Sequence, residues 1–162
     1  MKKLFAFTVL AFFILLLGSR ASLGPDKISG VIHFADGNTL EFSNILSFSA
    51  FIREKPPTKE AIPVRFEDGI RLVPLSQLKS FKIVDFEIVN LNREGGPPAK
   101  VWTGTAEVET TSGDKVRCKY DSFGIVDVEV TDKSTAAARI ESIFIIDFKA
   151  KSLKIKEIVF NN

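Results

Sequence analysis

The strongest constraint on this chain is a short turn that ends in glycine between two apolar stretches. The sequence contains such a turn three times, at residues 35–37, 67–69 and 111–113. Glycine adopts positive φ without the steric clash that a Cβ atom would cause. The pattern therefore predicts three β-hairpins with three-residue loops, in which Gly37, Gly69 and Gly113 have positive φ.

The loop length decides which residues oppose each other in a hairpin. A three-residue loop at 67–69 places Phe66 opposite Ile70 and Val64 opposite Leu72, so apolar side chains share one face, whereas a two-residue Asp68-Gly69 loop would mix the faces. The same argument predicts three-residue loops in the other two hairpins. Their expected pairs are Ile32 with Leu40, Gly30 with Phe42, Val108 with Val116, and Ala106 with Cys118.

This register predicts which side chains are buried and which are exposed. The residues expected to be buried are Phe34, Phe66, Leu72, Val108, Val116 and Cys118. The residues expected to be exposed are His33, Arg65, Arg71, Glu107 and Glu109.

The rest of the chain is rich in β-branched and aromatic residues at strand spacing. We expect a helical turn at 74–78, a short helix within 132–138, and strands at 27–52, 79–90, 101–110, 125–131, 139–148 and 152–160. In the strand 79–90, alternation places Phe81, Ile83 and Asp85 on one face and Lys82, Val84, Phe86 and Ile88 on the other. The predicted fold class is all-β: an antiparallel β-sandwich or open barrel built from repeated hairpins.

The first 21 residues have the pattern of a signal peptide. Lys2 and Lys3 precede an unbroken apolar run at 4–17, and Ser19-Arg20-Ala21 supplies small residues for cleavage after Ala21. The run is shorter than the roughly 20 residues of a membrane-spanning helix. We therefore expect an exported protein, periplasmic or secreted, with no stable membrane span after leader cleavage. The alternative is tethering to the membrane by an uncleaved N-terminal segment.

Residues 22–162 are expected to form one all-β domain. Its two halves, about 22–91 and 100–162, are joined by the Gly/Pro-rich link 92–98. A half of this size without disulfides or metal is marginally stable alone, which favours a single domain. The leader holds three of the 22 basic residues and none of the 20 acidic ones, so the rest has 22 − 3 = 19 basic and 20 acidic residues. A net charge of −1 gives no reason to expect a nucleic-acid partner.

Residues that could carry chemistry are few. The sequence has one histidine, His33, and one cysteine, Cys118. Their distance in sequence argues against a Cys-His nucleophile, and their number argues against a zinc site. Cys118 is expected to be a buried small hydrophobe. We predict no catalytic, cofactor-binding or metal-binding residues, and no cofactor.

Two charged patterns have alternative interpretations. The carboxylate pairs are Asp85 with Glu87, Glu107 with Glu109, and Asp127 with Glu129. They are typical of a solvated sheet surface, but could serve a glycan-directed hydrolase or bind calcium. The lysines 149, 151, 154 and 156 either protect an edge strand from pairing or attract an anionic membrane surface, and the first interpretation is favoured.

These observations favour an exported, non-catalytic β-module of a bacterial cell envelope, with a structural role or an envelope protein or glycan as its partner. A carboxylate-dependent hydrolase and a carrier of an apolar ligand are the alternatives. For the binding module, strands 79–90 and 139–148 would offer extended surfaces, because sheet edges bind partners by adding a strand. Candidate contacts are Phe51, Ile52 and Val31.

The leader gives the first prediction. Cleavage after Ala21 means that the exported protein begins near Ser22, which N-terminal sequencing measures. Recovery of the chain from a membrane fraction with Met1 still in place would contradict it.

Overall fold

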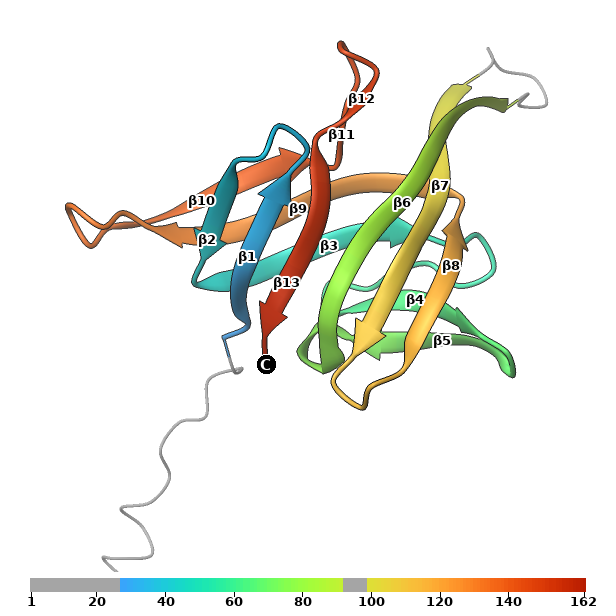
Figure 1. The fold of residues 1–162 in the computed structure, drawn as a ribbon, viewed down its shortest axis with the longest axis horizontal. Helices are drawn as coiled ribbons and strands as arrows, with labels where there is room; N and C mark the ends of the chain where they lie inside the picture. Colours follow the sequence, from blue (N-terminus) through green and yellow to red (C-terminus); the bar gives the residue numbers. More distant parts are fainter. Residues whose placement is uncertain (1–26, 92–98) are drawn as a thin grey trace, which may run out of the picture.

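The computed structural model describes residues 27–91 and 99–162, so the predicted leader 1–21 and the link 92–98 lie outside the described residues. Within these ranges the fold is all-β with antiparallel pairing throughout (Figure 1). The strands are β1 (Ser29–Phe34), β2 (Thr39–Phe42), β3 (Asn44–Phe51), β4 (Ala61–Phe66), β5 (Gly69–Pro74), β6 (Leu78–Leu91), β7 (Ala99–Thr110), β8 (Lys115–Tyr120), β9 (Ser122–Thr131), β10 (Ala138–Phe144), β11 (Ile146–Asp147), β12 (Ser152–Leu153) and β13 (Ile155–Asn161). The helical turn expected at 74–78 is present as the 3₁₀ turn η1 (Leu75–Gln77).

The strands form a six-stranded sheet in the order β2-β1-β13-β6-β7-β8 and a three-stranded sheet in the order β10-β9-β3. Two smaller sheets, β4-β5 and β11-β12, complete the fold. Strands that are distant in sequence pair directly. The last strand, β13, lies between β1 and β6, and β3 pairs with β9.

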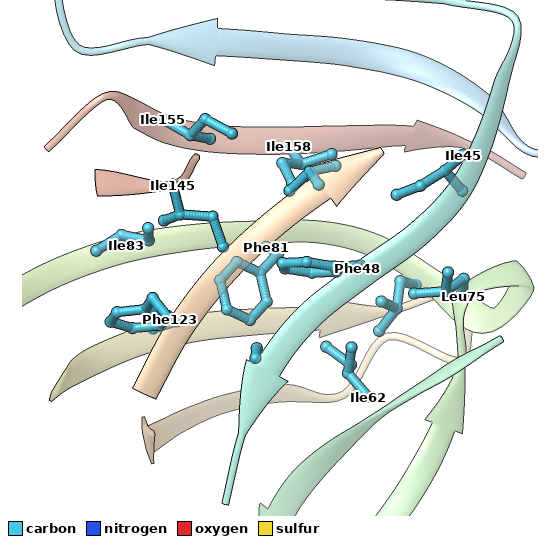
Figure 2. Packing of buried hydrophobic residues seen from close by; sticks show 14 of the residues in the cluster. Ile45, Phe48, Ile62, Leu75, Phe81, Ile83, Phe123, Ile145, Ile155 and Ile158 are labelled. Carbon is cyan, nitrogen blue, oxygen red and sulfur yellow. The ribbon is translucent and has the colours of Figure 1, made fainter. Parts of the chain in front are cut away.

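The hydrophobic core contains buried side chains from both larger sheets, and Phe81 of β6 packs against several of its aromatic rings. The Phe81 ring packs edge-on against Phe48 of β3 and Phe123 of β9, with 4.7 and 6.4 Å between the ring centroids. Its contact with Tyr120 of β8, at 5.4 Å, is tilted. Figure 2 shows Phe48 and Phe81 at the centre of the cluster, with isoleucines from several strands around them. Both larger sheets thus depend on the same aromatic contacts.

The predicted hairpin turns are confirmed in part. Gly37, Gly69 and Gly113 all have positive φ. The first and third hairpins have the expected register, with Gly30 opposite Phe42, Ile32 opposite Leu40, Ala106 opposite Cys118 and Val108 opposite Val116.

The predicted register of the second hairpin is wrong. Phe66 opposes Gly69 and Val64 opposes Arg71, so the loop is the two residues Glu67 and Asp68. The prediction assumed that one face of this hairpin is buried along its whole length. Instead, β4 and β5 form a separate sheet whose tip reaches solvent, and there the Arg71 guanidinium stacks on the Phe66 ring at 3.9 Å. Mixed faces carry little cost at such an exposed tip.

The predicted alternation in 79–90 fails after Ile83. A β-bulge between Ile83 and Asp85 leaves Val84 without an opposing residue in β7 and shifts the register. Phe86 and Ile88 therefore oppose Gly104 and Trp102 and lie on the same sheet face as Phe81 and Ile83, contrary to the prediction. One extra residue in a strand reverses the faces of all residues that follow it.

The region 132–148 also differs from its prediction. No helix forms at 132–138, because the Asp132 carboxylate accepts hydrogen bonds from the Ser134 and Thr135 backbone N–H groups and closes a turn. The strand expected at 139–148 ends at Phe144, and Ile146 begins a second short strand.

Burial follows the predictions in part. Val108 and Cys118 are buried and Arg65 and Arg71 are exposed, as expected. Four residues expected to be buried are half-buried instead: Phe34, Phe66, Leu72 and Val116. His33, Glu107 and Glu109 are likewise half-buried and not exposed. These three lie on β1 and β7, which have neighbours on both sides, so adjacent side chains cover part of each.

Gly104 gives a stability prediction. A Cβ atom there would lie 2.2 Å from the Asp85 carbonyl oxygen and 2.8 Å from the Phe86 Cα, whereas Gly69 has open space around it. Gly69→Ala should cost about 1 kcal/mol of unfolding free energy through its positive φ alone. Gly104→Ala should cost about 3 kcal/mol, because the backbone of the bulge must move. Urea unfolding measures both, and equal losses would contradict the prediction.

Candidate functional site

The single cysteine serves the packing of the β4-β5 sheet. Cys118 is 1% exposed, and its Sγ accepts a hydrogen bond from the Arg65 N–H at 3.3 Å. Next to it, the Tyr120 hydroxyl donates to the Pro63 carbonyl at 2.9 Å. Burial raises the pKa of the Cys118 thiol and raises that of Tyr120 well above its ordinary value. The neutral thiol is a weak nucleophile, which agrees with the structural role predicted for it.

The acidic residues of β7 lie among cations. The Glu109 carboxylate contacts Lys79 Nζ at 2.7 Å and Lys115 Nζ at 3.2 Å, and the hydrogen bond from Lys79 is the largest cause of its lowered pKa. Glu107 lies between Lys82 and Arg117 on the neighbouring strands. On the neighbouring strand β6, Asp85 accepts a hydrogen bond from the Thr105 N–H beside the bulge, and Glu87 lies 3.8 Å from Lys119 Nζ.

The acidic residues of β9 contact hydroxyl groups and one lysine. Asp127 accepts hydrogen bonds from the Ser47 hydroxyl at 2.5 Å and the Ser142 hydroxyl at 2.6 Å, one on each carboxylate oxygen. Glu129 contacts Lys27 Nζ at 3.0 Å. Among residues 27–91 and 99–162, no three His, Cys, Asp or Glu side chains gather closely enough to hold a metal ion.

The favoured interpretation of the lysines is wrong. Edge protection requires them to lie on an edge strand, but β13, which carries Lys156, is paired with β1 on one side and β6 on the other. Lys149 and Lys151 lie in the turn between β11 and β12, and Lys154 follows β12. These three exposed lysines therefore do not lie on an edge strand of either larger sheet.

The three predicted contact residues differ in how far they are exposed to solvent. Phe51 is 40% exposed, Val31 is half-buried, and Ile52 belongs to the core at 1% exposure. Beyond Phe51, the described chain exposes five large apolar side chains: Val84, Ile88, Ile140, Phe144 and Phe148. Of these, Ile140 is the most exposed at 67%.

Four aromatic rings join this exposed set to the core. We name them the aromatic row, which consists in order of Phe86, Trp102, Phe148 and Phe144. The centroids of neighbouring rings in this row are 5.9, 5.9 and 5.4 Å apart. Trp102 is 5% exposed, whereas Phe148 and Phe144 are 50% and 45% exposed. The bulge in β6 builds the row, because it turns Phe86 to the face that carries Trp102.

Strand β10 lies beside the exposed end of this row and is an open sheet edge. It pairs with β9 on one side only. The edges at β2, β3 and β8 are protected in different ways. Strand β2 has only four residues, β3 has β4 packed beside it, and β8 carries Lys115, Arg117 and Lys119. Strand β10 has seven residues, and Ile140 and Phe144 lie on one face of it.

The grooves on the surface are open, and charged side chains form part of their walls. One of about 680 Å³ lies between the tip of the β4-β5 hairpin and β8, and its charged lining residues are Arg65, Arg71, Lys115, Arg117, Glu67, Asp68 and Asp114. Another, of about 620 Å³, includes Phe51 and Val101 together with Arg53, Glu87 and Lys119. The charged lining of the first groove does not favour an apolar ligand there.

Comparison of the chain with protein-family models, with curated proteins and with solved structures found no match. Within the described ranges, none of the helical segments has the length and hydropathy needed to cross a bilayer.

The sequence prediction missed Ile140, Phe144 and Phe148 because it placed all three in one long strand. A signal was present. Residues 140 and 143–146 are apolar at both odd and even positions, which strict alternation in a half-buried strand does not produce.

Tyr120 gives a prediction about stability and its pH dependence. Tyr120→Phe leaves the Pro63 carbonyl without its buried donor and should cost about 1–3 kcal/mol at neutral pH. Because the pKa of Tyr120 is raised in the folded state, its contribution to stability is complete below about pH 10 and declines above it. The variant should therefore lose less stability than the wild type between neutral and strongly alkaline pH. Denaturant unfolding across that range measures both effects, and parallel pH profiles would contradict the prediction.

Proposed function

We propose that this protein is an exported, non-catalytic binding module of the bacterial cell envelope, and that it binds an extended segment of another protein along β10. The observation that carries the proposal is the free edge of β10. An edge strand presents unpaired backbone N–H and C=O groups that another chain can pair with. Strand β10 contains no lysine or proline, and no strand pairs with its outer side.

The side chains of β10 support strand addition. Backbone pairing supplies affinity in this mode, and alternate side chains supply specificity. Ile140 and Phe144 are exposed on one face of the strand, with Ser142 between them. The hydrogen bond from the Ser142 hydroxyl to Asp127 joins this face to β9 and keeps the edge in place.

The finer architecture in this proposal is a β-sandwich, with the six-stranded and three-stranded sheets as its layers. Its support is that Phe48 and Phe123 of the smaller sheet pack on Phe81 of the larger sheet. Packing of this kind would hold β9, and through it β10, in a fixed position for binding.

The test of the binding mode uses Ile140→Lys, because an outward lysine on an edge strand opposes strand addition. The control is Val84→Lys, which places the same charge at an exposed apolar residue of β6, a strand with neighbours on both sides. With a partner isolated from the envelope by the wild-type protein, Ile140→Lys should lose binding and Val84→Lys should keep it. Amide hydrogens of β10 should exchange more slowly in the wild-type complex.

Two outcomes would contradict the proposal. One is binding that survives Ile140→Lys, or slower amide exchange only outside β10. The other is turnover in a substrate screen that disappears in Glu107→Gln or Asp127→Asn, because the module would then be a carboxylate-dependent enzyme.

A further inference from the structure

The hairpin β11-β12 and the end of β10 together carry exposed aromatic rings and exposed lysines. We name this set the basic tip: Phe144, Phe148, Lys149, Lys151 and Lys154. All five side chains are exposed, and Phe148 packs on Phe144 and on Trp102. The hairpin projects from the body of the molecule beside the start of β13 (Figure 1).

The charge of the tip is positive. Residues 144–154 contain three lysines and one acid, Asp147, which gives 3 − 1 = +2. The Asp147 carboxylate accepts hydrogen bonds from the backbone N–H groups of Ala150 and Lys149, at 2.9 and 2.8 Å. These bonds close the turn and lower the pKa of Asp147, the one from Ala150 being the larger cause. The acid is thus directed to the backbone, while the lysine side chains extend into solvent.

We propose that the basic tip docks this protein on an anionic lipid bilayer. Phe148 and Phe144 enter the boundary between headgroups and acyl chains, where aromatic side chains are favoured. Each lysine buries its aliphatic stem and keeps its ammonium group among the lipid phosphates. This inference does not rest on strand addition at β10, and either can hold without the other.

The shape of the tip favours a bilayer over an acidic protein. A stable protein interface buries about 800 Å² on each partner and needs complementary surfaces. Here two strands of two residues each carry a projecting turn. A fluid lipid surface can surround such a projection without a matching shape.

The Phe148 ring also has a fixed position before it meets lipid. Its T-shaped contacts with the buried Trp102 and with Phe144 hold the ring at the base of the tip. Docking therefore requires little ordering of the chain, which reduces its entropic cost.

The test measures sedimentation of the purified exported protein with phosphatidylcholine vesicles that contain or lack phosphatidylglycerol. Binding is expected only to the anionic vesicles. It should weaken as salt shortens the Debye length from about 10 Å to about 3 Å. The triple variant Lys149→Gln, Lys151→Gln and Lys154→Gln should lose about a hundredfold in partitioning, at about fivefold for each lysine.

Matched controls separate the tip from general charge and hydrophobicity. A control triple variant removes the same charge from exposed lysines of other regions and should change partitioning little. Its substitutions are Lys59→Gln, Lys82→Gln and Lys133→Gln. Phe148→Ser should lose about tenfold, whereas Phe51→Ser at another exposed phenylalanine should not. Circular dichroism establishes that each variant is folded, and the lysine variants test the tip even if Phe148→Ser unfolds.

Three results would overturn the proposal. They are no binding of the wild type to anionic vesicles, equal binding to neutral vesicles, and equal losses in the two lysine triples. A further result would assign the tip to an acidic protein instead of lipid. Soluble polyglutamate would displace the protein from anionic vesicles as well as additional anionic vesicles do, and a folded Phe148→Ser variant would bind as the wild type does.

Discussion

The fold depends on the contact between Phe81 and the three rings around it. Phe81 belongs to β6 in the six-stranded sheet, whereas Phe48 and Phe123 belong to β3 and β9 in the three-stranded sheet. Aromatic pairs contribute about 0.5–1.5 kcal/mol beyond the burial of their area when they meet edge to face. One side chain thereby connects both larger sheets. Its neighbour Tyr120 extends the connection to the β4-β5 sheet through the hydrogen bond to Pro63.

The sequence was sufficient to predict strand register where apolar and polar residues alternate without interruption. The prediction fails where a bulge or a shorter turn changes the face on which the following side chains lie. The first and third hairpins follow their glycine turns, and Ala106 and Val108 of β7 oppose Cys118 and Val116 as expected. No glycine or proline lies in the strand 79–90, so the sequence gives no local signal for the bulge at Val84. The register of the second hairpin was predicted wrongly because its glycine turn resembles that of the first hairpin, whereas the strands around the two hairpins differ. Strand β1 pairs with β13 as well as β2, whereas β4 pairs with β5 alone.

Pairing between distant strands could not be derived from the sequence either. The lysines near the C-terminus suggested an edge strand, but β13 is inserted between β1 and β6. No local pattern encodes that neighbour relation, because it depends on the packing of the whole core. The candidate surface has the same limit. Ile140 and Phe148 were visible as apolar residues, but their exposure depends on β10 being an edge and on the turn that follows Asp147.

The bulge in β6 links the core to both proposed surfaces. Without it, Phe86 and Ile88 would lie on the face opposite Trp102 and would add two large apolar side chains to the solvent side of the sheet. Trp102 would then lose the ring that packs on it from β6, and Phe148 would rest on a less rigid support. Gly104 permits the bulge, since no side chain occupies the space that the Asp85 carbonyl needs. A small residue inside the sheet thus supports the packing of Phe86 on Trp102, the ring on which Phe148 of the basic tip rests.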